Sequence, residues 1–275
     1  MPFEKDVLAI FREKVYNERR IDAGKGVIGM TKIQAHRGAS KERPENTMAA
    51  FRRAEELHAD GIEMDVHLLP DGSLAVHHDD RLGRTVVEGS GSIYGYTFEQ
   101  LQAFSAGLGF SEAYRSEKIP SFRELLEFLK GNQIFLNVEI KAGTGFLTGV
   151  EDTVVDMLRE YHMEDRCIIS SFNHFILKNI KERYPEFAVG ALYSVTLGKD
   201  MADYAASWGC DALHADYHLV DQALVDKAHS LGIAVNVWTV DEEADINRML
   251  TLGVDNIISN DAALALKLRD AFAQR

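Results

Sequence analysis

Three carboxylates stand in two short apolar runs, at positions where strand geometry would bring them together. The run GIEMDV carries Glu63 and Asp65, and the later run IFLNVEI carries Glu139. Side chains at positions i and i+2 of a strand share a face, so Glu63 and Asp65 point the same way. Carboxylates that converge from two strands form a site for a hard divalent cation. The pattern leaves open a buried network of two ion pairs instead, Glu139–Lys141 and Glu63–Arg37.

Two histidines are candidates for proton transfer, because imidazole titrates near neutral pH. His36 ends the run KIQAH and precedes Arg37, whereas His78 ends the run SLAVHH after a Pro-Asp-Gly turn that predicts a hairpin. His77 and His78 are adjacent, so an extended strand would point them to opposite sides and only one could face the cation. The chain has ten histidines, and a lone histidine more often packs in a core or lies on the surface.

These candidates belong to a repeating pattern of strands and helices that begins at Thr31. Several helical patterns open with Asn, Ser or Asp, the residues that cap a helix N-terminus. The eight apolar runs are KIQAH, GIEMDV, IFLNVEI, RCIISS, FAVGAL, DALHA, IAVNVW and DNIIS. The predicted helices are Asn46–His58, Ser121–Lys130, Phe146–Tyr161, Asn173–Arg183, Asp221–Leu231, Asp241–Leu252 and Asp261–Ala271.

Eight strands that alternate with helices predict an α/β fold, a (β/α)8 TIM barrel of about 250 residues. The alternative is a doubly wound open sheet, but the Gly-x-Gly-x-x-Gly turn that such a sheet often carries is absent. Polar side chains would point into the barrel from four strands. They are Gln34, His36, Glu63, Asp65, Asn137, Glu139, Lys141, Asn236 and Trp238. Unpaired charges are costly in an interior, so this set favours a metal or a ligand among them.

Two segments fall outside the barrel pattern. The pattern of residues 1–30 predicts an N-terminal helical extension, and the barrel would span 31–275. The extension would pack on the barrel or on a second subunit of a homo-oligomer. Its apolar stripe consists of Phe3, Val7, Ile10, Phe11 and Val15. Residues 80–118 predict an insertion after the second strand, rich in Gly and Ser beyond Asp80. A long loop after a barrel strand is expected on the catalytic face.

The charge of the chain excludes several classes of partner. Forty-three acidic and thirty basic residues give a net charge of −13, with a pI near 5.2. Such a surface repels nucleic acid and anionic lipid, so neither a nucleic-acid partner nor stable membrane association is expected. Charges interrupt the apolar runs near the N-terminus, and no segment approaches the roughly 20 apolar residues of a membrane span. We therefore expect a soluble, cytoplasmic protein.

Several short motifs, taken in order, resemble the glycerophosphodiester phosphodiesterase family. They are HRG, PENT, GIEMDV, DGSLAVHHD with Arg84-Thr85 downstream, NVEIK, SSF, VWTV and GVDNIISND. The resemblance runs from Thr31 to about Ala271 and does not include the N-terminal extension. It implies a TIM barrel that hydrolyses a small-molecule glycerophosphodiester to glycerol 3-phosphate and an alcohol. It also implies one divalent cation, Mg²⁺ or Ca²⁺, since carboxylates serve both.

The resemblance assigns roles to individual residues. The metal carboxylates would be Glu63, Asp65 and Glu139. The catalytic pair would be His36 and His78, of which we take His36 as the base and His78 as the acid, although the sequence allows the reverse. The pattern places the catalytic histidine directly before Asp79, which selects His78 over its neighbour. Substrate contacts would come from Arg37, Glu45, Lys141, Phe172 and Trp238.

Two other functions remain open at this stage. One is phospholipase-D-like hydrolysis of lysophospholipids on the same barrel and metal, which would need an apolar surface at the mouth. The insertion offers aromatic residues for such a surface, namely Tyr94, Tyr96, Phe98, Phe104, Phe110 and Tyr114. The other is a non-catalytic barrel that binds a phosphometabolite. The presence of every expected acid, base and ligand residue argues against the second function.

Overall fold

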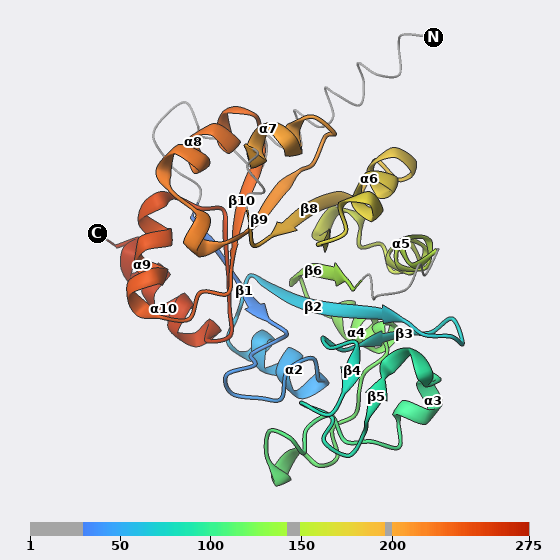
Figure 1. Ribbon diagram of the computed structural model, residues 1–275. Coiled ribbons are helices and arrows are strands. Elements are labelled where there is room, and N and C mark those ends of the chain that lie inside the picture. The colour runs from blue at the N-terminus through green and yellow to red at the C-terminus, as the bar shows by residue number, and fades with distance from the viewer. Residues whose placement is uncertain (1–29, 142–148, 196–199, 275) are drawn as a thin grey trace.

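Eight parallel strands close into a barrel with helices around it, as the sequence predicts (Figure 1). The structure is a computed structural model that describes residues 30–141, 149–195 and 200–274. The N-terminal helix predicted for residues 1–30 lies outside the described residues except for Met30. The barrel strands are β1 (Lys32–His36), β2 (Gly61–Leu68), β6 (Phe135–Ile140), β7 (Cys167–Ser171), β8 (Ala188–Tyr193), β9 (Ala212–Asp216), β10 (Ala234–Trp238) and β11 (Asn256–Ser259).

The strand register brings the predicted site residues to one level of the barrel. Strand β1 pairs with both β11 and β2, which closes the sheet. His36 on β1 lies opposite Glu63 on β2, and Asp65 on β2 lies opposite Glu139 on β6. Because all three strands are parallel, their carboxyl ends meet at the same rim, where TIM barrels carry their active sites.

The helices between the strands begin where the sequence places capping residues. Asp, Asn, Ser or Thr side chains accept backbone N–H groups at the start of α2, α4, α6, α7, α8 and α10. Helix α7 is absent from the predicted set, because six residues are too few to show a helical period. The helices are α2 (Met48–Glu56), α4 (Phe122–Leu129), α5 (Val150–Glu160), α6 (His174–Arg183), α7 (Met201–Ala206), α8 (Gln222–Ser230), α9 (Glu243–Leu252) and α10 (Ala262–Phe272).

The hydrophobic core lies between the barrel wall and these helices. The alternation predicted for β2 is confirmed, since Ile62, Met64 and Val66 are fully buried in this layer. Each such side chain contributes roughly 1.5–3 kcal/mol by leaving water. Their neighbours Glu63 and Asp65 point to the opposite face, into the barrel. The apolar layer therefore holds the strand that carries the acidic residues.

Polar side chains inside the barrel form a hydrogen-bonded belt below the acidic residues. The chain of bonds runs from Ser170 to Asn137, Gln34, Asn256, Asn236 and His214, with distances from 2.6 to 3.1 Å. The remaining two strands contribute Gly61 and Gly190, whose missing side chains leave room for Gln34 and His214. Inward Asn and Gln side chains thus satisfy one another, while Oδ1 of Asp65 above them has no hydrogen-bond partner.

The insertion after β2 has an apolar core of its own. It contains β3 (Leu74–Val76), which pairs antiparallel with β2 as the hairpin motif predicts, followed by β4 (Arg81–Leu82), β5 (Gly91–Ser92) and α3 (Phe98–Leu101). Figure 1 shows these elements gathered on one side of the barrel. Their core consists of Leu69, Ala75, Leu82, Val86, Ile93, Leu101, Ala106 and Ile119. None of the helices in the described residues is long and apolar enough to cross a membrane.

Candidate active site

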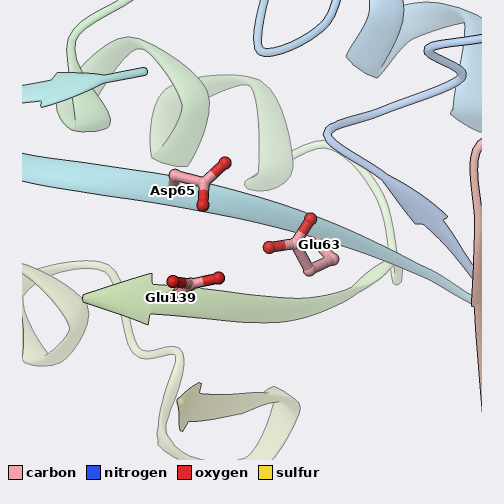
Figure 2. Close-up of side chains that lie close together, drawn as sticks. All are labelled: Glu63, Asp65 and Glu139. Atoms are coloured by element: carbon pink, nitrogen blue, oxygen red, sulfur yellow. The ribbon is translucent and has the colours of Figure 1, made fainter. Parts of the chain in front are cut away.

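Glu63, Asp65 and Glu139 converge inside the barrel rim, as the alternation of β2 and β6 predicts. One carboxylate oxygen from each residue lies within 4.8 Å of the others, and all three residues are buried. Figure 2 shows the Glu63 and Asp65 side chains on β2 facing Glu139 near the end of β6. The Oδ1 atom of Asp65 is buried and has no hydrogen-bond partner. Three carboxylates supply hard oxygen ligands, and one of their oxygens has no hydrogen-bond partner. Such a set suits a divalent cation.

The proximity of the three carboxylates shifts their protonation. Burial and the charges of Asp65 and Glu139 raise the pKa of Glu63 well above its ordinary value. Burial and Asp65 likewise raise the pKa of Glu139 to about 7. Burial acts on Asp65 in the same sense, but Lys141 and Arg37 outweigh it and hold the pKa of Asp65 below its ordinary range. The cluster therefore carries more negative charge than its surroundings neutralise.

Lys141 and Arg37 are the cationic side chains that lie beside the carboxylates. The Nζ atom of Lys141 lies 2.8 Å from Oε1 of Glu139 and 3.5 Å from Oδ1 of Asp65. Glu63 accepts the backbone N–H of Arg37 at 3.0 Å rather than its guanidinium. Of the two ion pairs in the alternative network, Glu139–Lys141 is formed and the Glu63–Arg37 side-chain pair is not.

A tight turn after β1 carries Arg37 into this position. Arg37 has a φ of 56° and Gly38 a φ of 79°, in the left-handed region that favours glycine. A Cβ atom on Gly38 would lie 2.7 Å from Ala50, so the turn packs directly on α2. The guanidinium of Arg37 then bonds to Glu45 at 2.8 Å, and its Nε lies 3.7 Å from Asp65.

His36 is held in one orientation by a relay of hydrogen bonds. Its Nδ1 lies 2.7 Å from Oδ1 of Asn260, whose amide nitrogen donates to Asp241 at 2.7 Å. The amide oxygen can only accept, so Nδ1 of His36 carries the proton and Nε2 has a free lone pair. That Nε2 lies 3.8 Å from Oε2 of Glu63. Burial and the charge of Arg37 lower the pKa of His36 to about 4, which keeps the ring neutral.

His78 lies on the other side of the carboxylates and pairs with Asp79. Its Nδ1 is 2.6 Å from Oδ1 of Asp79, and burial, Arg37 and Lys141 lower its pKa while Asp65 and Asp79 oppose that shift. His78 lines a cavity of about 310 Å³ together with Glu139 and Lys141. The adjacent His77 is buried and is not among the residues that line this cavity.

Two aromatic residues frame the cavity mouth. Phe172 lines the cavity with half of its surface exposed. It packs edge-on against Trp238, with 5.6 Å between the ring centroids. The indole N–H of Trp238 donates to the carbonyl oxygen of His214 at 2.8 Å, which fixes the ring. Phe172 directly follows β7 and lines the same cavity as His78, and Trp238 ends β10 beside it.

Sequence reasoning missed several residues that support the predicted set. The side-chain amide of Asn46, in the PENT motif, donates a hydrogen bond to Asp65 at 2.8 Å. Asn260 stands in the quoted GVDNIISND segment, but its bond to His36 spans most of the chain. His67 lies 2.8 Å from the hydroxyl of Tyr94 and 3.2 Å from the carbonyl oxygen of His78. No local pattern reveals such contacts.

The barrel and the polar residues at its rim define the class of protein. An eight-stranded parallel barrel with acidic, basic and imidazole groups at the carboxyl ends of β1, β2 and β6 is a TIM-barrel enzyme. The chain belongs to the glycerophosphoryl diester phosphodiesterase family, whose model matches residues 36–264. It is therefore a phosphoric diester hydrolase, and the resemblance seen in the motifs is confirmed.

Relatives and solved structures agree with this assignment. A glycerophosphodiester phosphodiesterase of Caldanaerobacter subterraneus subsp. tengcongensis is 39% identical and covers 86% of this chain and 97% of its own length. One from Bacillus altitudinis is 36% identical, with 88% and 99% covered. An Oleispira antarctica phosphodiesterase, solved in complex with the product sn-glycerol-3-phosphate, superposes with a TM-score of 0.82 at 28% identity, covering 88% of this chain and 97% of that one.

Proposed function

We propose that the protein hydrolyses glycerophosphodiesters to glycerol 3-phosphate and an alcohol, with one divalent cation bound by Glu63, Asp65 and Glu139. The observation that carries this proposal is the buried cluster of three carboxylates, in which Oδ1 of Asp65 accepts no hydrogen bond. The product complex of the Oleispira antarctica relative supports the glycerol 3-phosphate half of the substrate. When bound, the cation would supply positive charge that polarises the phosphodiester.

Cationic side chains of the chain itself hold the phosphate in this proposal. Lys141 and Arg37 both lie within 4 Å of Asp65 and face the same centre. Their charge stabilises the negative charge that builds on the phosphoryl oxygens in the transition state. Glu45 holds the guanidinium of Arg37 at 2.8 Å and so sets its direction. Phe172 and Trp238 supply the apolar wall against which the carbon skeleton packs.

The two histidines divide the proton transfers. His36 is the base, because its relay to Asn260 leaves Nε2 with a free lone pair. It takes the proton of the glycerol hydroxyl next to the ester as that oxygen attacks phosphorus. His78 is the acid, because Asp79 at 2.6 Å stabilises its protonated form. It gives a proton to the departing alkoxide, and water then opens the cyclic phosphate by the reverse transfers.

The two alternative functions have less support from the same site. Tyr94, Tyr96, Phe98 and Phe104 pack against the apolar core of the insertion, so they are not available as a membrane-binding surface. Of the six aromatic residues considered for that surface, Phe110 is about half exposed. A lysophospholipid substrate is therefore disfavoured. A non-catalytic barrel has no need of two imidazoles held in fixed tautomers beside an acidic cluster.

Hydrolysis of a substrate panel tests the proposal. The panel consists of glycerophosphocholine, glycerophosphoethanolamine, glycerophosphoglycerol, glycerophosphoinositol and a lysophospholipid, each with Mg²⁺ or Ca²⁺. We expect glycerol 3-phosphate as the common product of the first four, and the rates identify the alcohol and the cation that the enzyme prefers. Turnover of the lysophospholipid alone would favour the phospholipase-D-like function, and binding without turnover would favour the non-catalytic one.

A further inference from the structure

Arg84 ties the insertion to the barrel rim at the point where two site residues lie. It follows β4 and is the first residue of the Arg84-Thr85 pair. Its guanidinium contacts two carboxylates that come from different loops. Nε lies 2.6 Å from Oδ2 of Asp79, and the two terminal nitrogens lie 2.9 and 2.6 Å from the oxygens of Glu45. One of those nitrogens also lies 3.1 Å from Oδ1 of Asp79.

These contacts engage most of the N–H groups of the guanidinium. Five N–H groups are available on an arginine, and four hydrogen bonds to carboxylate oxygens are present. Bidentate pairs between arginine and carboxylate are among the strongest and most directional hydrogen bonds in proteins. Arg84 is also half exposed, which places it at the edge of the site rather than among the acidic groups. Because its hydrogen bonds are directed to Asp79 and Glu45, Arg84 is not placed to bind a phosphate.

Each of the two carboxylates bonded to Arg84 also forms a hydrogen bond with a proposed functional group. Asp79 uses the Oδ1 atom that it shares with Arg84 to bind Nδ1 of His78 at 2.6 Å. Glu45 uses the Oε1 atom that it shares with Arg84 to bind Arg37 at 2.8 Å. A chain of hydrogen bonds therefore runs from the proposed acid to the proposed phosphate contact, with Arg84 in the middle.

We propose that Arg84 is a positioning residue, which fixes His78 through Asp79 and Arg37 through Glu45. This inference rests on the proposed function, because it assigns Arg84 to the residues that perform it. Without Arg84, Asp79 keeps His78 as a partner but loses the two bonds that fix its own rotamer. The ring of His78 then samples orientations in which its free nitrogen misses the leaving oxygen. Small losses of orientation of this kind are costly to rate.

A double-mutant cycle tests whether Arg84 acts through His78. Turnover of glycerophosphocholine and of the nitrophenyl ester of glycerol phosphate is measured for wild type, Arg84→Met, His78→Ala and the double variant. We expect Arg84→Met to lower kcat for the choline diester about 10- to 100-fold with KM changed less than about threefold, since orientation in the transition state is lost. In the His78→Ala background we expect a clearly smaller further loss, because only the route through Glu45 to Arg37 remains.

Two more variants separate positioning from mere attachment of the insertion. Arg84→Lys keeps the charge but cannot bridge both carboxylates, so we expect it to lose most of the rate that Arg84→Met loses. Arg81→Met removes an exposed arginine from β4 in the same insertion and should match wild type in rate. Thermal melting of each variant reports its stability. If Arg84→Met does not fold, Arg84→Lys carries the same cycle.

The outcomes distinguish this inference from the proposed function. Losses that multiply in the double variant would show that Arg84 acts independently of His78, and would overturn a role through that residue. Wild-type kinetics in Arg84→Met, or full rate in Arg84→Lys, would overturn the inference as well. Failure of wild type to hydrolyse any diester of the panel, or an unaffected His78→Ala variant, would instead overturn the proposed function or its acid.

Discussion

At the scale of single residues, the site is defined by charges that do not balance. Glu63, Asp65 and Glu139 bring three carboxylates together, and the cations beside them are Lys141 and Arg37. Burial and the neighbouring carboxylates together raise the pKa values of Glu63 and Glu139. A cation removes the imbalance by replacing protons, which makes the proposed metal site testable without any substrate.

Cation binding should release protons near neutral pH. The pKa values of Glu63 and Glu139 are raised, that of Glu139 to about 7, so in the cation-free protein they bind protons more tightly than ordinary carboxyl groups, and a carboxylate ligand must lose those protons. Affinity for Mg²⁺ or Ca²⁺ should therefore rise with pH between 6 and 8, by on the order of tenfold per pH unit for each proton displaced. Calorimetric titration in two buffers of different ionisation enthalpy measures the release. Equal heats in both buffers and an affinity independent of pH would argue against the carboxylates as ligands.

The adjacent histidines should differ in what their removal costs. His78→Ala is expected to lose about 10²–10⁴-fold in kcat/KM for a natural diester, the usual contribution of a general acid. His77→Ala should stay within about tenfold and lower the melting temperature instead, because the His77 ring is buried. A nitrophenyl ester, whose leaving group needs little protonation, should restore much of the rate of His78→Ala. Restoration in His36→Ala instead would mean that the acid and base roles are exchanged.

The convergence of the three carboxylates could be predicted from local pattern, whereas contacts between distant segments could not. Strand alternation alone placed Glu63, Asp65 and Glu139 on inward faces, since the period of two is a property of the extended backbone. The partner that fixes the tautomer of His36 lies on the other end of the chain, at Asn260. Its bond depends on barrel closure between β1 and β11, which no local spacing encodes.

At the scale of secondary-structure elements, the polar belt explains how eight strands carry so many polar side chains inward. Six side chains from β1, β6, β7, β9, β10 and β11 bond to one another in sequence. Each bond contributes only about 0.5–1.5 kcal/mol, but a buried partner left alone costs about 1–3 kcal/mol. The belt therefore specifies the order and register of the strands on whose ends the acidic residues stand.

Gly190 should be required for the belt to close. A Cβ atom at this position on β8 would lie 2.3 Å from Nε2 of His214, which accepts from Asn236. Gly190→Ala must displace the imidazole and break that bond, so we expect a loss of about 1–3 kcal/mol in the free energy of unfolding. Denaturant unfolding measures it. Gly95→Ala is the control, because nothing lies within 4 Å of a Cβ there. Equal stability of the two variants would mean that the belt tolerates a shifted ring.

Elements with strong periodicity were predicted and irregular ones were not. The eight strands and seven of the barrel helices have apolar patterns long enough to read, whereas α7 has six residues. The insertion was predicted as a Gly- and Ser-rich loop, yet it contains a separate apolar cluster. Its apolar residues lie at irregular spacing between Leu69 and Ile119, so the cluster depends on tertiary folding rather than on a repeat.

At the scale of the whole molecule, the charge distribution separates the surface from the site. The net charge of −13 discourages anionic surfaces from associating with the protein. At the rim, Arg37, Lys141 and Arg84 gather around the acidic cluster and supply local positive charge. A small diester, whose phosphate carries one negative charge, can reach these groups. This arrangement agrees with a small-molecule substrate.

Turnover of glycerophosphocholine after removal of divalent cations tests the central claim most directly. The protein is dialysed against EDTA, assayed, and assayed again after Mg²⁺ or Ca²⁺ is added in excess. We predict that turnover falls to background without a cation and returns with at least one of the two. The reason is that Glu63, Asp65 and Glu139 offer carboxylate oxygens, the ligands that both cations prefer. Glu139→Gln should need more cation for the same recovery. Full turnover in excess EDTA would contradict the account.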